Sequence, residues 1–423
     1  MELDMRLAAL QRAMTRYHAG RMSRRDVLGL AGKLGLTAAA VALLGATKAS
    51  AASPKGHSGH NARLQEGSPE GGPPPVATPQ LGEQPDGTRI GKVVVGAMIM
   101  EELAEINAFL PGEITINAGD SIFFEMMGFH AVSFLSGGEV QPIFIPAEGA
   151  APVATPPASA AAYPQLMFNP AVLFPAGGPA YDGTGYVNSG VALDPSTPPF
   201  VLKFTTPGTY EYLCPIHPNY MRARVIVQEA GAELPMDQAG VDQVAAEQLA
   251  AYMSTVQELK TQYGAATPAA ADGATTHEVA VGPGQESVEL LAFLPAELSI
   301  KAGDTVRWNY RGSISPHTVT FLGGAEQPED IIIAPPAGGP PQVFVSPITF
   351  FPSDKPAAYN GQGFVNSGYM GVLPELVGIE YDTPDTFDLT FDTPGEYKYY
   401  CILHAGGPDD PIGQSMVGRI TVS

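Results

Sequence analysis

Apolar and polar residues alternate with a period of two along several short stretches of the chain. In FVLKF (200–204) the residues Phe200, Leu202 and Phe204 fall on one face, and FDLTF (387–391) repeats the spacing. Turn sequences such as AGD and TPG separate these stretches. Strict alternation bounded by turns is typical of half-buried strands in antiparallel sheets. The pattern therefore predicts an all-β protein built as a sandwich.

One segment has a helical pattern instead. Residues 237–264, DQAGVDQVAAEQLAAYMSTVQELKTQYG, carry apolar residues at helical spacing, with Asp237 as an N-cap and Gly264 as a stop. We expect a helix in the linker 231–275 that packs against the β-structure. A helix that docks a partner protein is the alternative.

The chain contains the same module twice. AFLPGEITINAGD (108–120) matches AFLPAELSIKAGD (292–304), and FTTPGTYEYLCPIH (204–217) matches FDTPGEYKYYCILH (391–404). The repeats predict two domains, 88–230 and 276–423. A Pro/Ala-rich insert interrupts each repeat (about 139–180 and 325–358), and we expect these inserts to pack as irregular loops over the sandwich.

The N-terminal segment has the layout of an export signal. Arg24 and Arg25 precede the apolar stretch LGLTAAAVALLGA, which small residues at Ala49 and Ala51 follow. Residues 1–51 therefore predict a twin-arginine signal peptide, and an amphipathic helix is the alternative. The prediction places the protein in the periplasm or elsewhere outside the cytoplasm, with a membrane tether only if the signal is retained. Residues 52–87 are rich in Pro, Gly and polar residues, which is typical of a disordered tether.

Net charge narrows the choice of partners. The chain of 423 residues carries a formal charge of −21. Because phosphate groups are repelled by such a surface, we expect no nucleic-acid partner.

Each repeat contains the same set of nitrogen and sulfur side chains. Both histidine-to-cysteine intervals are 84 residues, and a second histidine and a methionine follow each cysteine. Two imidazoles, one thiolate and a weak thioether form the ligand set of blue-copper electron-transfer sites. A disulfide between the two cysteines is the alternative for an exported chain. The candidate metal ligands are His130, Cys214, His217 and Met221 in the first repeat, and His317, Cys401, His404 and Met416 in the second.

The motif PGxYxYxC, leading into C-x2-H and a later Met, resembles the cupredoxins of the plastocyanin and pseudoazurin type, and the resemblance covers nearly all of both repeats. It implies two Greek-key β-sandwiches, each with one type 1 copper at one end, held by the eight residues above. It also implies an electron carrier with a redox protein as donor and another as acceptor. That family typically has Asn after the first histidine, where Ala131 and Thr318 stand here. The loop before Met416 is also longer, with eleven residues between it and His404 where the first repeat has three.

Two other functions compete with that of an electron carrier. Two-domain nitrite reductases and small laccases place a histidine directly before the blue-copper cysteine, where Leu213 and Tyr400 stand here. Outside residues 1–60, only His277 would remain for a catalytic second copper centre, so we expect no enzyme activity. Copper storage or delivery is the nearer alternative. In either case, His217 and His404 follow the strands onto loops, so we expect their rings to lie nearest solvent.

Overall fold

The computed structural model describes residues 79–148, 154–192, 197–264, 268–269, 275–334, 341–372 and 376–423. The predicted signal peptide 1–51 lies outside the described residues, as does the tether except for its last part. Among the described residues, no helix is both long and apolar enough to cross a membrane.

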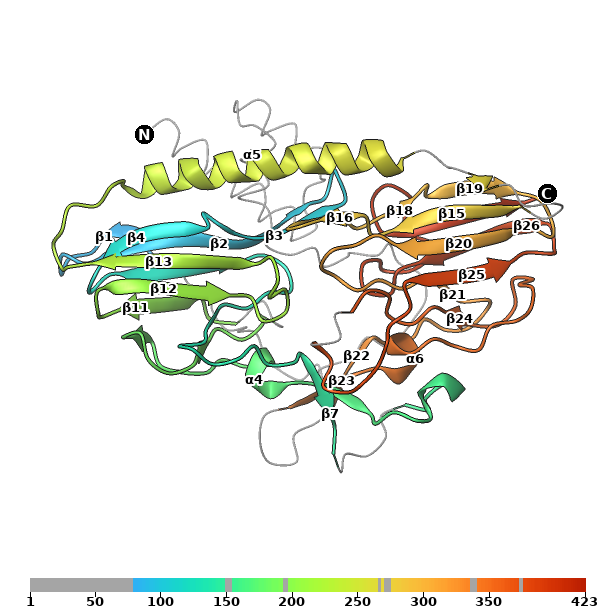
Figure 1. Ribbon diagram of the computed structural model, residues 1–423, viewed down its shortest axis with the longest axis horizontal. Coiled ribbons are helices and arrows are strands. Elements are labelled where there is room, and N and C mark those ends of the chain that lie inside the picture. Colours follow the sequence, from blue (N-terminus) through green and yellow to red (C-terminus); the bar gives the residue numbers. More distant parts are fainter. Residues whose placement is uncertain are drawn as a thin grey trace, which may run out of the picture.

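The described chain is dominated by strands, and each repeat forms a two-sheet sandwich (Figure 1). In the first repeat, one sheet has the order β16-β17-β3-β2-β5-β11-β9, with β1 also paired to β2, and the other has the order β10-β6-β12-β13-β4. The strands of the first repeat are β1 (Gly82–Glu83), β2 (Arg89–Ile99), β3 (Ala104–Leu110), β4 (Glu113–Asn117), β5 (Ser121–Met126), β6 (Ser133–Phe134), β9 (Ala180–Tyr181), β10 (Val187–Asn188), β11 (Phe200–Phe204), β12 (Gly208–Leu213) and β13 (Arg222–Gln228).

The second repeat is built in the same way. One sheet has the order β14-β15-β20-β25, with β18 paired to β15, and the other has the order β19-β27-β26-β21-β24. The strands of the second repeat in these sheets are β14 (Pro268–Ala269), β15 (Thr276–Val281), β18 (Phe293–Leu294), β19 (Glu297–Ile300), β20 (Thr305–Tyr310), β21 (Thr320–Phe321), β24 (Val365–Asn366), β25 (Thr386–Thr390), β26 (Gly395–Tyr400) and β27 (Val417–Val422). The all-β sandwich is confirmed.

The sheets are mixed rather than purely antiparallel. β2 runs parallel to β5, and β15 runs parallel to β20. In the first repeat the chain leaves the sheet after β3 to form β4 in the facing sheet, and returns as β5. Such crossings bring strands of the same direction side by side, which local alternation does not reveal.

The cores of the two sandwiches are aromatic and equivalent. Phe134 stacks on Tyr212 with ring centroids 5.0 Å apart, and Phe321 lies 5.3 Å from Tyr399 in the second repeat. Trp308, the single tryptophan of the chain, is fully buried in the second core. Each core also contains the cysteine and methionine of its repeat, so the sulfur ligands predicted from the sequence lie inside the sandwiches.

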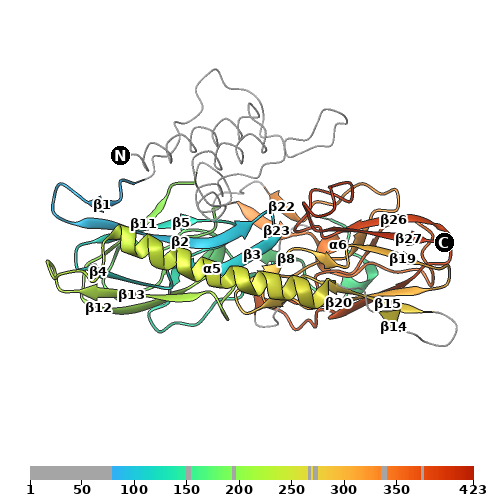
Figure 2. The same cartoon turned by 90° about the horizontal axis from the view of Figure 1, so that it is seen from above.

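The two repeats share strands. The hairpin of β16 (Gly284–Gln285) and β17 (Val288–Leu290) belongs to the second repeat, but β17 pairs antiparallel with β3 of the first. The helix α5 (Gln238–Tyr263) packs over this junction and contacts β2, β3, β16 and β17 (Figure 2). Its Asp237 side chain accepts a hydrogen bond of 3.0 Å from the Gly240 N–H, as the capping pattern predicted. The expected helix is confirmed, and it covers a sheet to which both repeats contribute.

The inserts also join the repeats, and the expectation of irregular loops is wrong. They form a four-stranded sheet of order β22-β23-β8-β7, which lies on the side of the molecule opposite α5 (Figure 1). Met167 of the first insert pairs with Phe344 of the second. The elements of the inserts are β7 (Phe144–Pro146), β8 (Leu166–Phe168), β22 (Ile331–Ala334), β23 (Gln342–Val345), the 3₁₀ turn η1 (Ala158–Ala160) and the short helices α4 (Pro170–Leu173) and α6 (Pro347–Phe350). Each insert pairs two strands of its own, β7 with β8 and β22 with β23, and the pairing of β8 with β23 joins the two inserts into one sheet.

Candidate metal centres

The first repeat brings His130, Cys214 and His217 together. His130 lies between β5 and β6, Cys214 directly follows β12, and His217 lies in the next turn. The two Nδ1 atoms are 3.1 Å apart, and Cys214 Sγ lies 4.0 Å from His130 Nδ1 and 3.8 Å from His217 Nδ1. Two imidazoles and one thiol, from segments 84 residues apart, thus converge on one point.

The second repeat reproduces this triangle. His317 Nδ1 and His404 Nδ1 are 3.0 Å apart, and Cys401 Sγ lies 3.8 Å from the first and 3.4 Å from the second. Both triads have the clustering expected of a metal site. Neither cysteine forms a disulfide.

The size of the triangles suits a transition metal. For sides of 3.1, 3.8 and 4.0 Å, or of 3.0, 3.4 and 3.8 Å, the equidistant point lies about 2 Å from each corner, near ordinary metal–imidazole and metal–thiolate lengths. Both histidines offer the same nitrogen, so the donors form a trigonal set of two imidazole nitrogens and one sulfur. The residues present therefore fit a metal of the copper type at each site.

Backbone hydrogen bonds place the methionines equivalently. Cys214 N–H donates to the Met221 carbonyl at 3.0 Å, and Met221 N–H donates to the His217 carbonyl at 3.0 Å. In the second repeat, Cys401 N–H donates to Met416 O at 3.0 Å, and Met416 N–H donates to His404 O at 3.4 Å. Both methionines are fully buried. The longer second loop therefore closes on the same bonds as the short one, which supports the alignment of Met416 with Met221.

Burial sets the protonation of the ligands. It raises the pKa of the Cys214 thiol and of the Cys401 thiol to about 11. It lowers the pKa of His130 and of His317 to about 3, so both imidazoles are neutral at neutral pH and have lone pairs to offer. Metal binding must then displace the thiol protons.

The residue after the first histidine braces the cysteine differently in the two repeats. Ala131 N–H donates to Cys214 Sγ at 3.5 Å, and Thr318 N–H donates to Cys401 Sγ at 3.3 Å. In addition, Thr318 Oγ1 accepts a 2.9 Å hydrogen bond from Ile402 N–H, next to the cysteine. The first repeat has Pro215 at that place, which has no N–H. Ala131 therefore leaves no donor unsatisfied, and Thr318 supplies the acceptor that the second loop needs.

Glycines allow close approach to the first histidines. Gly96 has φ +79° and Gly282 has φ +56°, and a Cβ on either would collide with the ring of His130 or His317, respectively. Each ring is thus clamped by a backbone segment that only glycine can form without strain.

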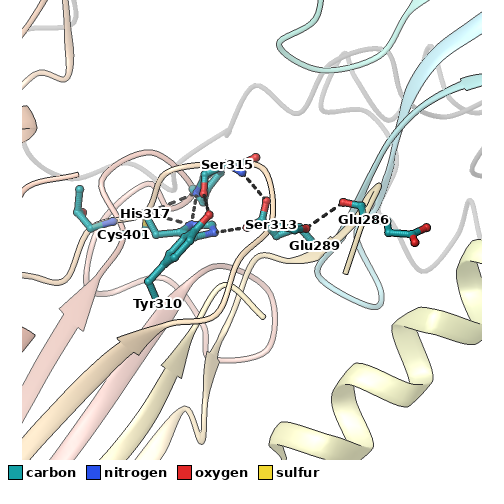
Figure 3. A network of polar contacts seen from close by, with 9 residues as sticks. Glu286, Glu289, Tyr310, Ser313, Ser315, His317 and Cys401 are labelled. Atoms are coloured by element: carbon teal, nitrogen blue, oxygen red, sulfur yellow. Dashed lines mark hydrogen bonds and ion pairs between the residues drawn. The ribbon is translucent and has the colours of Figure 1, made fainter. Parts of the chain in front are cut away.

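Two buried glutamates face the remote nitrogens of these rings. Glu289 Oε1 lies 3.2 Å from His317 Nε2, and its other oxygen accepts a 2.8 Å bond from Ser315 N–H (Figure 3). Glu105 Oε1 lies 3.7 Å from His130 Nε2, beyond hydrogen-bond length. Burial raises the pKa of Glu289 to about 8, and burial with repulsion from Glu289 raises that of Glu105 to about 7. Sequence analysis missed both residues; the signal available was an acidic residue within the apolar strands AEINAFL and VEL.

In each repeat the second histidine is the triad member nearest solvent, as expected, but very little of His217 is exposed. Its residue is 8% exposed, whereas His404 is partly exposed. Burial lowers the pKa of His217 well below its usual value, and repulsion from His130 and from His404 of the other repeat lowers it further. Leu403, next to His404, packs against the cores of both repeats. The loop that would meet solvent in a single domain is covered because the two repeats pack against each other there.

The remaining histidine of the described chain lies elsewhere. His277 Nε2 is 3.0 Å from Asp304 Oδ2, and its strand β15 pairs with β20. That contact lies at the turn before β20, where Asp304 also accepts hydrogen bonds from Thr275 N–H and Lys301 N–H. His277 thus has a structural partner outside both triads.

Comparison with known proteins supports a cupredoxin-like relationship. No protein-family model matches the chain. The chain is 26% identical over 132 residues to the chloroplastic plastocyanin of Tetradesmus obliquus, a match that covers 31% of this chain and 59% of that protein, less than two thirds of its length. Solved structures of amicyanin are also similar. A Cu(I) form and an oxidised form are each 20% identical with a TM-score of 0.19, and each match covers 37% of this chain and 92% or 98% of amicyanin.

Proposed function

We propose that this chain is an exported electron-transfer protein that carries one type 1 copper in each of its two domains. His130, Cys214, His217 and Met221 would hold one copper, and His317, Cys401, His404 and Met416 the other. The observation that supports this most is the recurrence in both repeats of one triangle of two imidazole nitrogens and a sulfur, with a buried methionine on the same hydrogen-bonded loop. When bound, copper supplies a one-electron redox change at such a site.

The chain's own residues keep each ligand set rigid. Gly96 and Gly282 clamp the first imidazoles, and backbone N–H groups of Ala131 and Thr318 point at the sulfurs. Ligands that are already oriented change little between oxidation states, and this favours fast electron exchange. These weak N–H hydrogen bonds to sulfur stabilise the thiolate and leave the sulfur free to bind the metal.

Burial favours a carrier over copper storage or delivery. Both cysteines and both methionines are fully buried, so no sulfur ligand is accessible for handing metal to an acceptor. An enzyme of the two-domain nitrite reductase or laccase type has less support, because Leu213 and Tyr400 stand where a bridging histidine would be and His277 is engaged by Asp304. The redox donor and acceptor would be proteins, and Arg24 and Arg25 support delivery of the folded chain by the twin-arginine route.

A copper assay combined with visible absorption tests the proposal. Purified protein should bind two coppers per chain and show intense thiolate-to-copper absorption when oxidised. Cys214→Ser and Cys401→Ser should each remove one copper and about half of the absorption. Copper bound without that absorption, and lost within seconds to a Cu(I) chelator, would favour storage or delivery instead.

A further inference from the structure

Two carboxyl groups are buried at the contact between the repeats. Glu105 on β3 is 7% exposed, and Glu289 on β17 is fully buried. The two are direct partners in the antiparallel register of β3 and β17. Residues directly opposite in such a pair have Cβ atoms about 4.5 to 5.5 Å apart and point to the same face of the sheet. The two side chains therefore lie side by side.

Each carboxyl points at a ligand of a different metal centre. Glu105 Oε1 lies 3.7 Å from His130 Nε2, and Glu289 Oε1 lies 3.2 Å from His317 Nε2. In each triad the Nδ1 atoms face the metal position, so Nε2 is the nitrogen left to carry the ring hydrogen. At His317 the Glu289 oxygen can accept that hydrogen, whereas at His130 the Glu105 oxygen is only in ion-pair contact, beyond hydrogen-bond length. The two neighbouring carboxyls thus lie between His130 and His317, in ion-pair contact with the first ring and hydrogen-bonded to the second.

Packing alone does not account for this pair. The neighbouring register partners are apolar, Ile106 with Val288 and Ala104 with Leu290. Burying an acid costs free energy, and like charges directly opposite on two strands destabilise the sheet further. Among the described residues, the ion-pair contacts of these two carboxyls are with the two histidines only. Apolar residues at both positions would make a more stable junction. The presence of acids there is therefore explained by their contacts with His130 and His317.

We propose that Glu105 and Glu289 form an internal bridge between the two metal centres, through which an electron passes from one repeat to the other. The inference rests on the proposed function. With copper bound at both sites, one centre would lose an electron and the other would gain it, so that no proton or further reactant would be consumed. Both domains then act as one electron store, so a partner that docks at either repeat reaches both centres.

Nuclear magnetic resonance on half-reduced, copper-loaded protein tests the bridge. Resonances near each centre are assigned from the Cys214→Ser and Cys401→Ser variants, and exchange between oxidised and reduced forms is measured at several protein concentrations. The exchange rate extrapolated to zero protein concentration, here called the intercept, is the intramolecular rate. We expect a non-zero intercept in the unmodified chain. In Glu289→Leu, which cannot accept the His317 hydrogen, we expect the intercept to be lower by about tenfold or more.

Two further variants separate the bridge from a general structural effect. Glu289→Gln keeps an acceptor for His317 and should retain most of the intercept. Glu102→Gln removes a carboxylate on the turn before β3, where it pairs with Lys260, and should leave the intercept unchanged. A zero intercept in the unmodified chain overturns the proposal. So does an unchanged intercept in Glu289→Leu, which would assign the exchange to His217 and His404.

A metal-free measurement keeps this test separate from the proposed function. In apo-protein, ¹⁵N spectra should show the His317 hydrogen on Nε2, and Glu289→Leu should shift or broaden that signal while His277 is unaffected. Apo-protein in which His317 does not respond to Glu289→Leu contradicts the bridge, whether or not the chain binds copper. Absence of thiolate-to-copper absorption with an intact His317 response contradicts the proposed function, and with it electron transfer between the centres, while the Glu289–His317 contact stands.

Discussion

The brace at Cys401 makes a quantitative prediction about the second domain. Thr318 Oγ1 accepts the 2.9 Å hydrogen bond of Ile402 N–H, and it lies 3.0 Å from Thr320 Oγ1. Thr320 keeps a bond to Asn366 Oδ1, so its own hydroxyl is not orphaned by a change at Thr318. Thr318→Ala therefore leaves one buried donor, the Ile402 N–H, without an acceptor.

The cost follows from two contributions. An unsatisfied buried N–H costs about 1 to 3 kcal/mol. Loss of the buried threonine methyl group costs about 1 kcal/mol more. We expect Thr318→Ala to lower the free energy of unfolding of the second domain by about 2 to 4 kcal/mol. In an Ile402→Pro background the N–H is already absent, as at Pro215 in the first repeat, so only the methyl contribution of about 1 kcal/mol should remain.

Trp308 reports on the core of the second domain. It is the only tryptophan in the chain and is fully buried in the second core, so its fluorescence follows unfolding of that domain in denaturant. Wild type, Thr318→Ala, Ile402→Pro and the double variant form a double-mutant cycle. The free energy lost by removing the apolar Ile402 side chain is the same on both sides of the cycle and cancels. A coupling free energy of about 1 to 3 kcal/mol is expected. Equal costs of Thr318→Ala in both backgrounds would refute the argument that the threonine is there for the Ile402 donor.

Three other outcomes are expected. Arg24→Lys with Arg25→Lys should leave full-length precursor in the cytoplasm, as seen by fractionation, and normal export of that variant would contradict twin-arginine dependence. Phe144→Ala should lower the free energy of unfolding by about 3 to 5 kcal/mol, because Phe144 is buried against Phe168 of its own insert and Phe350 of the other repeat; a loss below about 1 kcal/mol in denaturant titration would show that this contact is not tight. Copper uptake should release close to one proton per site and tighten with rising pH, because the thiol pKa values are raised to about 11 while the first-histidine imidazoles are already neutral. A pH-indicator dye in weak buffer measures the release, and release near zero would mean that the thiols are already ionised.

The sequence alone carried the local features and their chemistry. Alternation predicted the strands, the capping pattern predicted α5, and the repeated spacing predicted that His130, Cys214 and His217 converge. These predictions succeed because backbone periodicity and ligand type are properties of short segments. Internal repetition identified the ligand set as a metal site, because composition alone does not explain why the same set occurs twice at the same interval.

Tertiary structure decided how the two repeats meet. Alternation marks a segment as a strand without naming its partner, so the pairing of β17 with β3 and of β23 with β8 depended on the packing of whole domains. That packing covered His217, which a single domain would expose. It also set Glu289 opposite Glu105, although the two lie in different repeats and each looks like an isolated acid in an apolar strand. Which residues of one repeat reach the centre of the other was fixed only by the register between domains, because contacts between distant segments follow from how surfaces fit and not from local pattern.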